Sequence, residues 1–458
     1  MKYYRKFLMS LLALGFLFAC KQLPAQLVNE QIIEKARHST VRLITEELKR
    51  EFKFDDGSLF TLKRPGGGLG SGFFVDHDKI ATNIHCIAGK TKIRAKLVGT
   101  ETFYDIEGVI ASDPENDLVI LKVASKGPKP LSLGNSDAVQ MGEPIAVVGS
   151  PKGGTEGQVT LGKVYNRRDS DEWLRLKAKL HPGDSGGPVL SSKGVIGIAV
   201  QGGNTAYGSI SHAIPSNTLK QLLKKNYAAK PLDLEKWQQK EPILAYAYHN
   251  LASNMSKTGK SNSENQQLFY QKAIELSDKA IKLYESPTFY RLQGRVYEEL
   301  KEYQKAIDTY TECINLKSDY AIAHSDRGLV EWKRRHYEKA IANFQKVIEF
   351  IPDDVLSYMF MGSSKEALGR YDEAVDDFGK VIDELSPNNA NAYYNRGSAR
   401  YQWGKLEESL GRNVDAQNQY QAAEKDYNRA LQLNPNKDIS FRASHNLTLV
   451  KKALERLE

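Results

Sequence analysis

The sequence that decides the fold of the first half of this chain is HPGDSGGPVL, residues 181–190. Its central serine, Ser185, is followed by two glycines, and Gly183 stands two residues before it. A serine hydroxyl is a poor nucleophile until a base takes its proton and backbone N–H groups hold the oxyanion that forms. Glycine permits backbone dihedrals that a Cβ forbids, so such a loop can aim several N–H groups at one point. The stretch therefore makes Ser185 a candidate nucleophile.

Two earlier segments supply a candidate base and a candidate carboxylate. His85 lies in ATNIHC, residues 81–86, and Asp117 opens the apolar run of residues 117–123. A carboxylate beside such a run is costly to bury unless it is paired. Taken singly, the three residues also fit a satisfied core histidine, a strand-end cap and a glycine turn. Taken together, in the order His–Asp–Ser, they predict a catalytic triad.

The order of these residues resembles that of the trypsin-like serine proteases, and the surrounding segments resemble the HtrA/Deg branch. The resemblance runs from residue 27 to residue 223 and is carried by NEQIIEKARHSTVRLI (29–44), GSGFFVDHDKIATNIHCIAG (70–89), NDLVILKV (116–123), AVVGSPKGG (146–154), VTLGKV (159–164) and SHAIPSN (211–217). It implies two β-barrels with the active site in the cleft between them. It also implies that His85 is general base and then general acid, that Asp117 orients it, and that Ser185 forms the acyl-enzyme. The N–H groups of Gly183 and Ser185 would form the oxyanion hole.

The residue pattern itself agrees with an all-β domain. Short apolar runs alternate with Gly, Pro, Asn and Asp, which is typical of many short strands joined by turns. We expect strands at residues 91–98, 117–123, 144–148, 158–164 and 194–200. The predicted protease domain covers residues 21–227, and the resemblance implies a polypeptide as its substrate.

The chain departs from the HtrA pattern at Asp184, where those enzymes usually have Asn. Digestive proteases pair this acid with a new N-terminal amine, but no matching activation segment is found near Val28. We therefore expect Asp184 to find another partner, with His181 a candidate, or to be partly solvated. Lys179, six residues before Ser185, gives no support for cleavage after Lys or Arg. The resemblance implies a small or medium aliphatic P1 residue.

The second half is a repeat, and no PDZ-like domain is recognised after the protease. Gly294, Gly328 and Gly362 are spaced 34 residues apart. Each is followed after 12 residues by an alanine and after 16 by an aromatic residue, which are Ala306, Ala340 and Ala374 and then Tyr310, Phe344 and Phe378. This pattern is that of the tetratricopeptide repeat (TPR), in which small residues let two antiparallel helices approach. The fold class predicted for the whole chain is therefore multidomain, a double β-barrel followed by an all-α superhelix.

The repeat region is predicted to comprise four to five units over residues 243–442, after a linker at 228–242 and before a capping helix at 443–458. A degenerate first unit uses residues 243–255 and 268–283. In the last unit 26 residues separate Gly397 from Ala423, so 14 extra residues are expected in or near the turn at 406–416. Such arrays bind proteins or peptides.

Asn395 and Arg396 are expected to face the concave groove of the repeats, while most tyrosines are packing residues. A carboxylate clamp is not supported, because Asp326 stands where the neighbouring repeat would need Asn.

The N-terminus predicts export. A basic MKYYRK is followed by 13 residues without charge, 7–19, which is too short for an ordinary membrane span. The sequence LFAC, residues 17–20, resembles a bacterial lipobox and makes Cys20 the candidate lipidation site within a signal peptide at 1–20. Cleavage near Ala25 and a retained anchor are the alternatives. The predicted location is periplasmic or at the cell surface, with a lipid anchor in the membrane.

Composition excludes several other classes of function. The net charge of +8 is spread over both halves of 458 residues, so no nucleic-acid partner is indicated. No His, Cys or acidic cluster has metal-ligand spacing, so neither a metal nor another cofactor is indicated. Cys86 and Cys313 are most simply buried free thiols. A homo-oligomer is allowed by the resemblance, since trimers are common in the HtrA branch.

The sequence as a whole predicts an exported serine endopeptidase whose TPR array recruits proteins. The alternative is a scaffold for an envelope complex with an idle protease-like domain. The complete triad argues against that alternative.

Overall fold

The computed structural model describes residues 28–45, 48–53, 59–64, 67–90, 92–151, 155–166, 173–205, 208–225, 230–433 and 435–457. Two compact units divide the chain. The first holds residues 1–204 and 208–247, and the second holds 205–207 and 248–458. Each unit is described on its own below.

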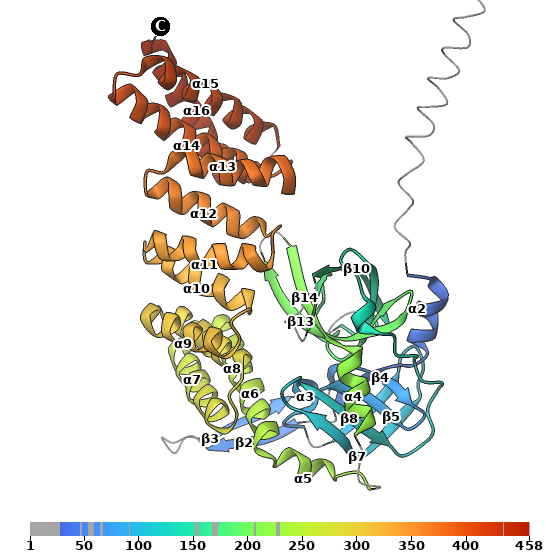
Figure 1. The fold of residues 1–458 in the computed structure, drawn as a ribbon. Coiled ribbons are helices and arrows are strands. Elements are labelled where there is room, and N and C mark those ends of the chain that lie inside the picture. The colour runs from blue at the N-terminus through green and yellow to red at the C-terminus, as the bar shows by residue number, and fades with distance from the viewer. Residues whose placement is uncertain are drawn as a thin grey trace, which may run out of the picture. The chain divides into compact units, whose positions relative to one another are not determined.

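The first unit contains two closed six-stranded antiparallel barrels, as predicted (Figure 1). The first barrel has the strand order β1-β4-β5-β8-β7-β6, with β1 (Thr40–Thr45), β4 (Gly67–Asp76), β5 (Lys79–Asn83), β6 (Ile93–Leu97), β7 (Phe103–Asp113) and β8 (Leu118–Val123). The second has the order β10-β11-β14-β13-β12-β9, with β9 (Pro144–Gly149), β10 (Gln158–Asn166), β11 (Leu174–Lys177), β12 (Pro188–Ser191), β13 (Gly194–Thr205) and β14 (Gly208–Pro215). All five strands expected from the sequence are present, with ends shifted by a few residues.

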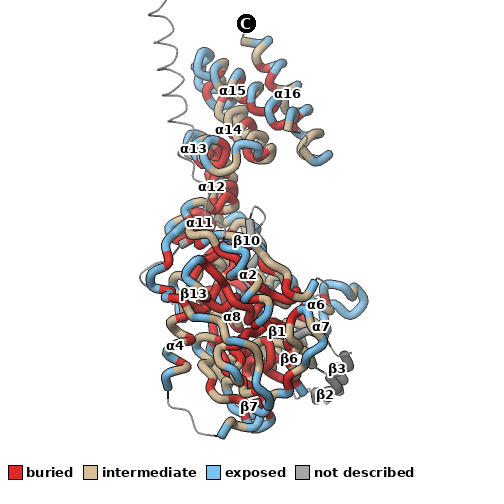
Figure 2. Tube along the Cα trace, turned by 90° about the vertical axis from the view of Figure 1, so that its right-hand side faces the viewer, coloured by how far each residue is buried: buried red, intermediate tan, exposed pale blue. Residues whose placement is uncertain are grey.

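The other elements of this unit lie outside the barrels. They are a two-stranded sheet of β2 (Leu48–Lys53) and β3 (Leu59–Arg64), and the helices α2 (Glu30–Arg37), α3 (Ile84–Ile87), η1 (Ser136–Ala138), α4 (Ser216–Lys224) and α5 (Leu234–Gln238). Alternation along the strands sends one set of apolar side chains inward. One buried cluster contains Phe73 and Ile120 of the first barrel together with Val148 and Ile198 of the second. The two barrels therefore share a core, which appears as the red interior in Figure 2.

The second unit is helical. Its elements are α6 (Glu241–Ser261), which begins in the first unit, α7 (Gln266–Leu283), α8 (Pro287–Glu299), α9 (Tyr303–Leu316), α10 (Ala321–Lys333), α11 (Tyr337–Phe350), α12 (Val355–Ala367), α13 (Tyr371–Lys380), the π-helical turn η2 (Val381–Leu385), α14 (Ala390–Ser409), α15 (Asn413–Gln432) and α16 (Lys437–Leu457). Figure 1 shows them stacked in antiparallel pairs. The predicted first repeat and terminal helix are present as α6–α7 and α16.

Close approaches between glycines and aromatic rings explain why these repeats have a glycine at this position. A Cβ added to Gly294 would lie 2.6 Å from the ring of Tyr310, and one on Gly362 would lie 2.8 Å from Phe378. The aromatic ring of each second helix thus occupies the space that a larger residue on the first helix would fill.

The 14 extra residues of the last unit do not enlarge its turn, which contains only Leu410, Gly411 and Arg412. They lengthen α14 and α15 to 20 residues each. The added turns repeat the same packing, since a Cβ on Gly404 would lie 2.7 Å from the ring of Tyr420. The expectation of an insertion in the turn is corrected, because small–aromatic packing continues along both helices.

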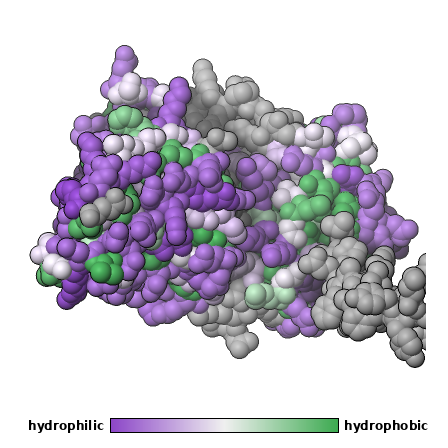
Figure 3. Space-filling view, turned by 90° about the horizontal axis from the view of Figure 1, so that it is seen from above, coloured by the Kyte–Doolittle hydropathy of each residue, from purple (hydrophilic) through white to green (hydrophobic). Residues whose placement is uncertain are grey.

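The surface seen in Figure 3 is mainly hydrophilic, with hydrophobic residues gathered at a few places. Exposed large apolar side chains of the last repeats are Leu406, Leu410 and Val414, at or beside the turn between α14 and α15, and Phe441 on α16.

Candidate active site

Asp117 lies in the turn between β7 and β8 and is held in one conformation. Its φ is +53°, a left-handed value that Asp tolerates better than most residues. Its carbonyl oxygen accepts hydrogen bonds from the backbone N–H of Ile84 and from Asn83 Nδ2, each at 3.1 Å. Its side chain is buried. The carboxylate is therefore fixed before any substrate arrives.

Both carboxylate oxygens of Asp117 contact His85. Oδ2 lies 2.5 Å from His85 Nδ1, and Oδ1 accepts the backbone N–H of His85 at 2.9 Å. The first contact fixes the ring and the second fixes the one-turn helix α3 that carries it. Burial by itself lowers the pKa of His85, but Asp117 and Cys86 outweigh it and raise that pKa well above 6.5. The arrangement favours an imidazole that accepts a proton and then holds it as imidazolium.

Ser185 lies in the loop before β12, and two backbone hydrogen bonds hold this loop in place. Its carbonyl oxygen accepts the N–H of Ser71 at 2.8 Å, and the N–H of Gly186 donates to Ala199 O at 2.8 Å. Gly186 has φ +85°, and a Cβ there would lie 2.1 Å from Ser71 O. No residue other than glycine fits without moving the backbone beside the serine.

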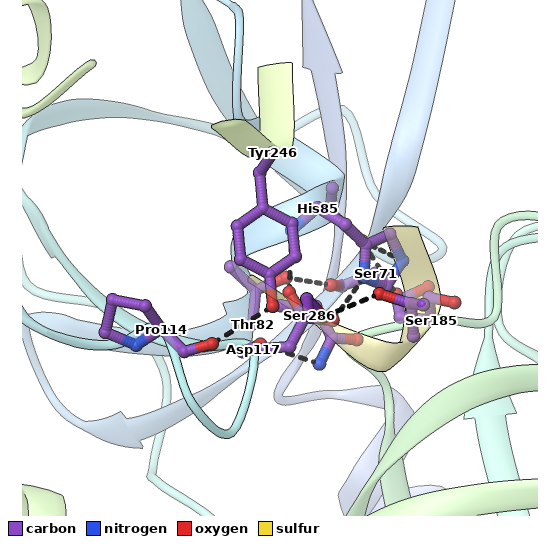
Figure 4. Close-up of polar contacts among 11 residues, drawn as sticks. Ser71, Thr82, His85, Pro114, Asp117, Ser185, Tyr246 and Ser286 are labelled. Carbon is purple, nitrogen blue, oxygen red and sulfur yellow. Dashed lines mark hydrogen bonds and ion pairs between the residues drawn. The ribbon is translucent and has the colours of Figure 1, made fainter. Parts of the chain in front are cut away.

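Cys86 links the histidine and the serine segments. Its Sγ lies 3.6 Å from His85 Nε2 and 3.6 Å from the carbonyl oxygen of Ser185. A Cβ on Gly70 would come within 2.5 Å of the same sulfur, so Gly70 leaves room for it. The structure thus brings His85, Asp117 and Ser185 together from three distant parts of the sequence (Figure 4).

Gly183 and Asp184 shape the loop in front of Ser185. Gly183 has φ +107°, and its carbonyl oxygen accepts the hydroxyl of Ser71 at 2.7 Å. The N–H groups of Asp184 and Gly187 are used inside the loop, donating to His181 O and Asp184 O at 3.0 Å each. These bonds set the course of the backbone that would present the predicted oxyanion hole.

Asp184 has found a partner within its own loop. Its Oδ2 accepts the backbone N–H of His181 at 2.7 Å and lies 3.7 Å from the ring nitrogen Nδ1. The carboxyl group is buried, which raises its pKa, while His181 partly offsets the rise. The expectation of another partner is confirmed, and that of partial solvation is wrong. Gly149 leaves the space, since a Cβ there would lie 2.4 Å from Asp184 Oδ1.

A second set of positioning residues was missed by sequence reasoning, because Gln238 lies in the segment predicted to be a linker and Tyr246 in the segment predicted to begin the repeats. Gln238, at the end of α5, accepts the N–H of Gly89 at 2.8 Å and donates to Ile87 O at 3.0 Å and Lys90 O at 2.9 Å. These backbone groups belong to the last residue of α3, which carries His85, and to the loop that follows it. Tyr246 donates its hydroxyl to Pro114 O at 3.0 Å, in the turn that holds Asp117 (Figure 4).

The only signal for this attachment in the sequence is the apolar content of residues 232–237. Trp237 is buried, and its indole N–H donates to Ser112 Oγ at 3.1 Å. Leu232 pairs with Val109 as an isolated antiparallel bridge. The segment 231–246 is therefore an integral part of the first unit.

Some predicted residues lie elsewhere. Cys20 and the signal peptide lie outside the described residues. Cys86 and Cys313 are buried free cysteines, as expected. Arg396, predicted to face the repeat groove, forms an ion pair with the buried Asp426 at 2.8 Å, and Asn395 on the same helix is partly buried. The described part of the chain contains no cluster of three metal-ligating side chains and no helix long and apolar enough to cross a membrane.

Comparison with known proteins identifies the family of each half of the chain. Residues 70–198 match the trypsin-like peptidase domain family, and residues 288–320, 362–404 and 411–437 match TPR families. The protein named Protease Do-like 5, chloroplastic, of Arabidopsis thaliana is 30% identical over 219 residues, covering 42% of this chain and 67% of that protein. The chain belongs to the trypsin-like peptidases of the HtrA/DegP type, followed by TPR repeats.

Other HtrA/DegP-type relatives are similar over about a third of this chain. Proteins named "Probable periplasmic serine endoprotease DegP-like" from Chlamydia muridarum and Rickettsia prowazekii are 32% and 34% identical, each over 34% of this chain and 33% of the relative. The chain thus spans about a third of the length of these relatives.

Among solved structures, "HtrA-type protease AlgW with decapeptide" is 24% identical with a TM-score of 0.36, covering 42% of this chain and 67% of that one. The active form of Rv3671c protease from M. tuberculosis is 20% identical with a TM-score of 0.36, covering 46% and 89%.

Proposed function

We propose that this protein is a serine endopeptidase in which His85, Asp117 and Ser185 form the catalytic triad. The observation that carries the proposal is the double contact of Asp117 with His85, on the ring and on the backbone. Cys86 Sγ, which touches both His85 Nε2 and the Ser185 carbonyl, supports the placement of the nucleophile beside the base.

The chemistry then follows from the geometry. His85 removes the proton of Ser185 as the hydroxyl oxygen attacks the scissile carbonyl carbon, and Asp117 stabilises the imidazolium. The N–H groups of Gly183 and Ser185 hold the oxyanion of the tetrahedral intermediate. The C–N bond breaks as His85 gives its proton to the leaving amine, which leaves an acyl-enzyme. Water, deprotonated by His85, hydrolyses that ester and restores the serine.

The repeats would bring proteins or peptides to the enzyme. TPR arrays offer extended surfaces for protein binding, and the match of three segments to TPR families supports this role. Export is proposed on the basic and apolar N-terminus and on the word periplasmic in the names of bacterial relatives. Lipidation at Cys20 is the proposed mode of membrane attachment.

Labelling with a fluorophosphonate probe, together with casein cleavage, tests the enzyme proposal. The purified wild type should be labelled and should cleave casein, and Ser185→Ala should do neither. Ser125→Ala, which alters an exposed serine, is the matched control and should behave as wild type. If Ser185→Ala cleaves casein as fast as wild type, the triad is refuted. A wild type that binds proteins without any turnover would instead support the idle scaffold.

Lipidation has its own test. Cells fed an alkyne analogue of palmitate should label the wild type, and Cys20→Ser should abolish the label. Equal labelling of both proteins would refute the anchor and leave the peptidase proposal intact.

A further inference from the structure

Glu366 on α12 is a half-buried acid without a cationic partner among the described residues. Its Oε1 accepts the hydroxyl of Ser398, on α14, at 2.7 Å. Burial raises the pKa of Glu366, which this hydrogen bond partly offsets, and within the described part of the chain no Lys, Arg or His pairs with it. The neighbouring cations are engaged elsewhere, since Lys365 pairs with Asp377 at 2.8 Å and Arg370 with Glu373 at 2.5 Å.

Glu366 lines a pocket of about 390 Å³ built from several repeats. Three of the lining residues are aromatic, namely Trp332, Tyr337 and Tyr371, and Gln402 of α14 supplies an amide. Aromatic rings attract cations through their electron-rich faces, and a carboxylate in the same pocket adds to that attraction. The indole nitrogen of Trp332 is also buried without a hydrogen-bond partner in the described structure.

In a preceding repeat the acid equivalent to Glu366 has a cationic partner, which Glu366 lacks among the described residues. Glu298 stands four residues after Gly294, as Glu366 stands four after Gly362. Glu298 has a cation from the next repeat, because Lys333 Nζ lies 2.5 Å from its Oε1. Lys333 is the fifth residue after the glycine of its repeat, Gly328.

The same place opposite Glu366 is occupied by a neutral residue. The fifth residue after Gly397 is Gln402, which lines the pocket with Glu366. Glu298 is therefore paired with a cation from the next repeat, Lys333. Glu366 faces the neutral Gln402 across a cavity instead. A half-buried carboxylate without a counter-ion loses part of its hydration, so a cation brought by a ligand would be favoured beside Glu366.

We propose that this pocket binds the basic side chain, Lys or Arg, of an extended polypeptide segment. The cation would contact Glu366 and the aromatic rings that line the pocket. This inference rests on the proposed protein-binding role of the repeats and assigns that role a chemical preference.

Fluorine NMR on the full chain labelled with 5-fluorotryptophan tests the proposal. Of the four Trp signals expected, that of Trp332 is identified by its loss in Trp332→Phe. N-acetyl-arginine amide and N-acetyl-lysine amide should shift this signal saturably. Their dissociation constants should be on the order of millimolar, since each probe offers only one charged side chain for binding. N-acetyl-norleucine amide, a neutral isostere of the lysine probe, should bind at least about tenfold more weakly. Equal binding of the neutral probe would overturn the proposal.

Three variants sharpen the test. Glu366→Gln keeps the hydrogen bond to Ser398 and should weaken arginine amide at least about tenfold. Gln402→Lys recreates the Glu298–Lys333 pair and should also block binding. Glu298→Gln is the matched control, because it changes the equivalent acid outside the pocket, and should bind as wild type.

Unchanged affinity in both Glu366→Gln and Gln402→Lys, with native circular dichroism, would overturn the proposal. If Glu366→Gln fails to fold, Gln402→Lys carries the same test. Casein cleavage measured on the same samples keeps the two hypotheses apart. Casein cleavage without cation binding would refute only the cation-binding proposal. Cation binding without casein cleavage would refute only the peptidase proposal.

Discussion

Replacing Gln238 by Met should damage catalysis from a position outside the triad. Gln238 is buried, with 4% of its surface exposed, and makes three hydrogen bonds to the backbone of residues 87–90. Methionine has nearly the same length and volume but can neither donate nor accept as the amide does. The substitution therefore removes the bonds without opening a cavity.

The magnitude follows from the groups left behind. One N–H and two carbonyl oxygens would lose their hydrogen bond to the amide, at roughly 1–3 kcal/mol for a buried group left unsatisfied, while Ile87 O keeps the N–H of Lys90 at 3.1 Å. With relaxation of the loop and entry of water, we expect a loss of about 3 kcal/mol. For a domain of this size that lowers the transition temperature by about 10 °C.

The same loop follows the helix that positions His85, so its movement reaches the catalytic base. A displacement of about 1 Å can cost on the order of 100-fold in rate. We expect kcat/KM for a peptide substrate to fall roughly 10- to 100-fold, mainly through kcat, because substrate contacts are unchanged.

Steady-state kinetics and thermal melts of the full chain measure both effects. Gln239→Met, at the neighbouring exposed position, is the matched control and should leave both quantities near wild type. A Gln238→Met protein with wild-type kcat and transition temperature would show that the segment contributes nothing to the site.

Other perturbations have equally definite outcomes. As the pH falls, kcat/KM should reach half its maximum above pH 6.5, because His85 acts as a base only when it is neutral. Burial lowers the pKa of His85, but Asp117 outweighs it and raises that pKa. A midpoint below pH 6.5 would contradict this electrostatic effect. Gly362→Ala places a Cβ 2.8 Å from the ring of Phe378 and should cost about 1–3 kcal/mol of helical stability, seen as earlier loss of the 222 nm signal. Asp184→Asn should raise the transition temperature at pH 7, since burial raises the pKa of this acid and its ionised form therefore opposes folding. That gain should vanish as the pH falls towards 4, and a gain that persists there would refute the assigned cause.

The double barrel and the residues of the candidate triad were predictable because each rests on a local pattern. His85, Asp117 and Ser185 lie in short segments whose composition reports their surroundings, and the strands follow runs of alternating or continuous apolar residues. The repeats were predictable for a similar reason, since a fixed period makes one unit evidence for the next. For the repeats the deciding information lies within about 35 residues of sequence, whereas the triad was predicted from three short segments taken together in their order.

Contacts between distant residues left no such pattern. Gln238 and Ile87 are 151 positions apart, and nothing near either one indicates the other. Arg396 likewise looked available for a ligand until its partner Asp426, 30 residues later, was in place. The lengthened α14 and α15 were misplaced for a different reason. A fixed spacing of 12 residues assigned the extra residues to the turn, although Gly404 and Tyr420 repeat the packing signal two helical turns further along.

The contacts of the segment after α4 change where the peptidase unit ends. Composition placed that end at residue 227, because the Pro-containing stretch that follows was predicted to be a linker. The structure instead extends the first unit to Ala247. In that extension Trp237 and Gln238 hold β7 and the loop after His85, and Tyr246 holds the turn of Asp117. The acid and the base of the candidate triad are thus both supported by residues that the double barrel itself lacks. The smallest part of this chain able to position them therefore includes the start of α6.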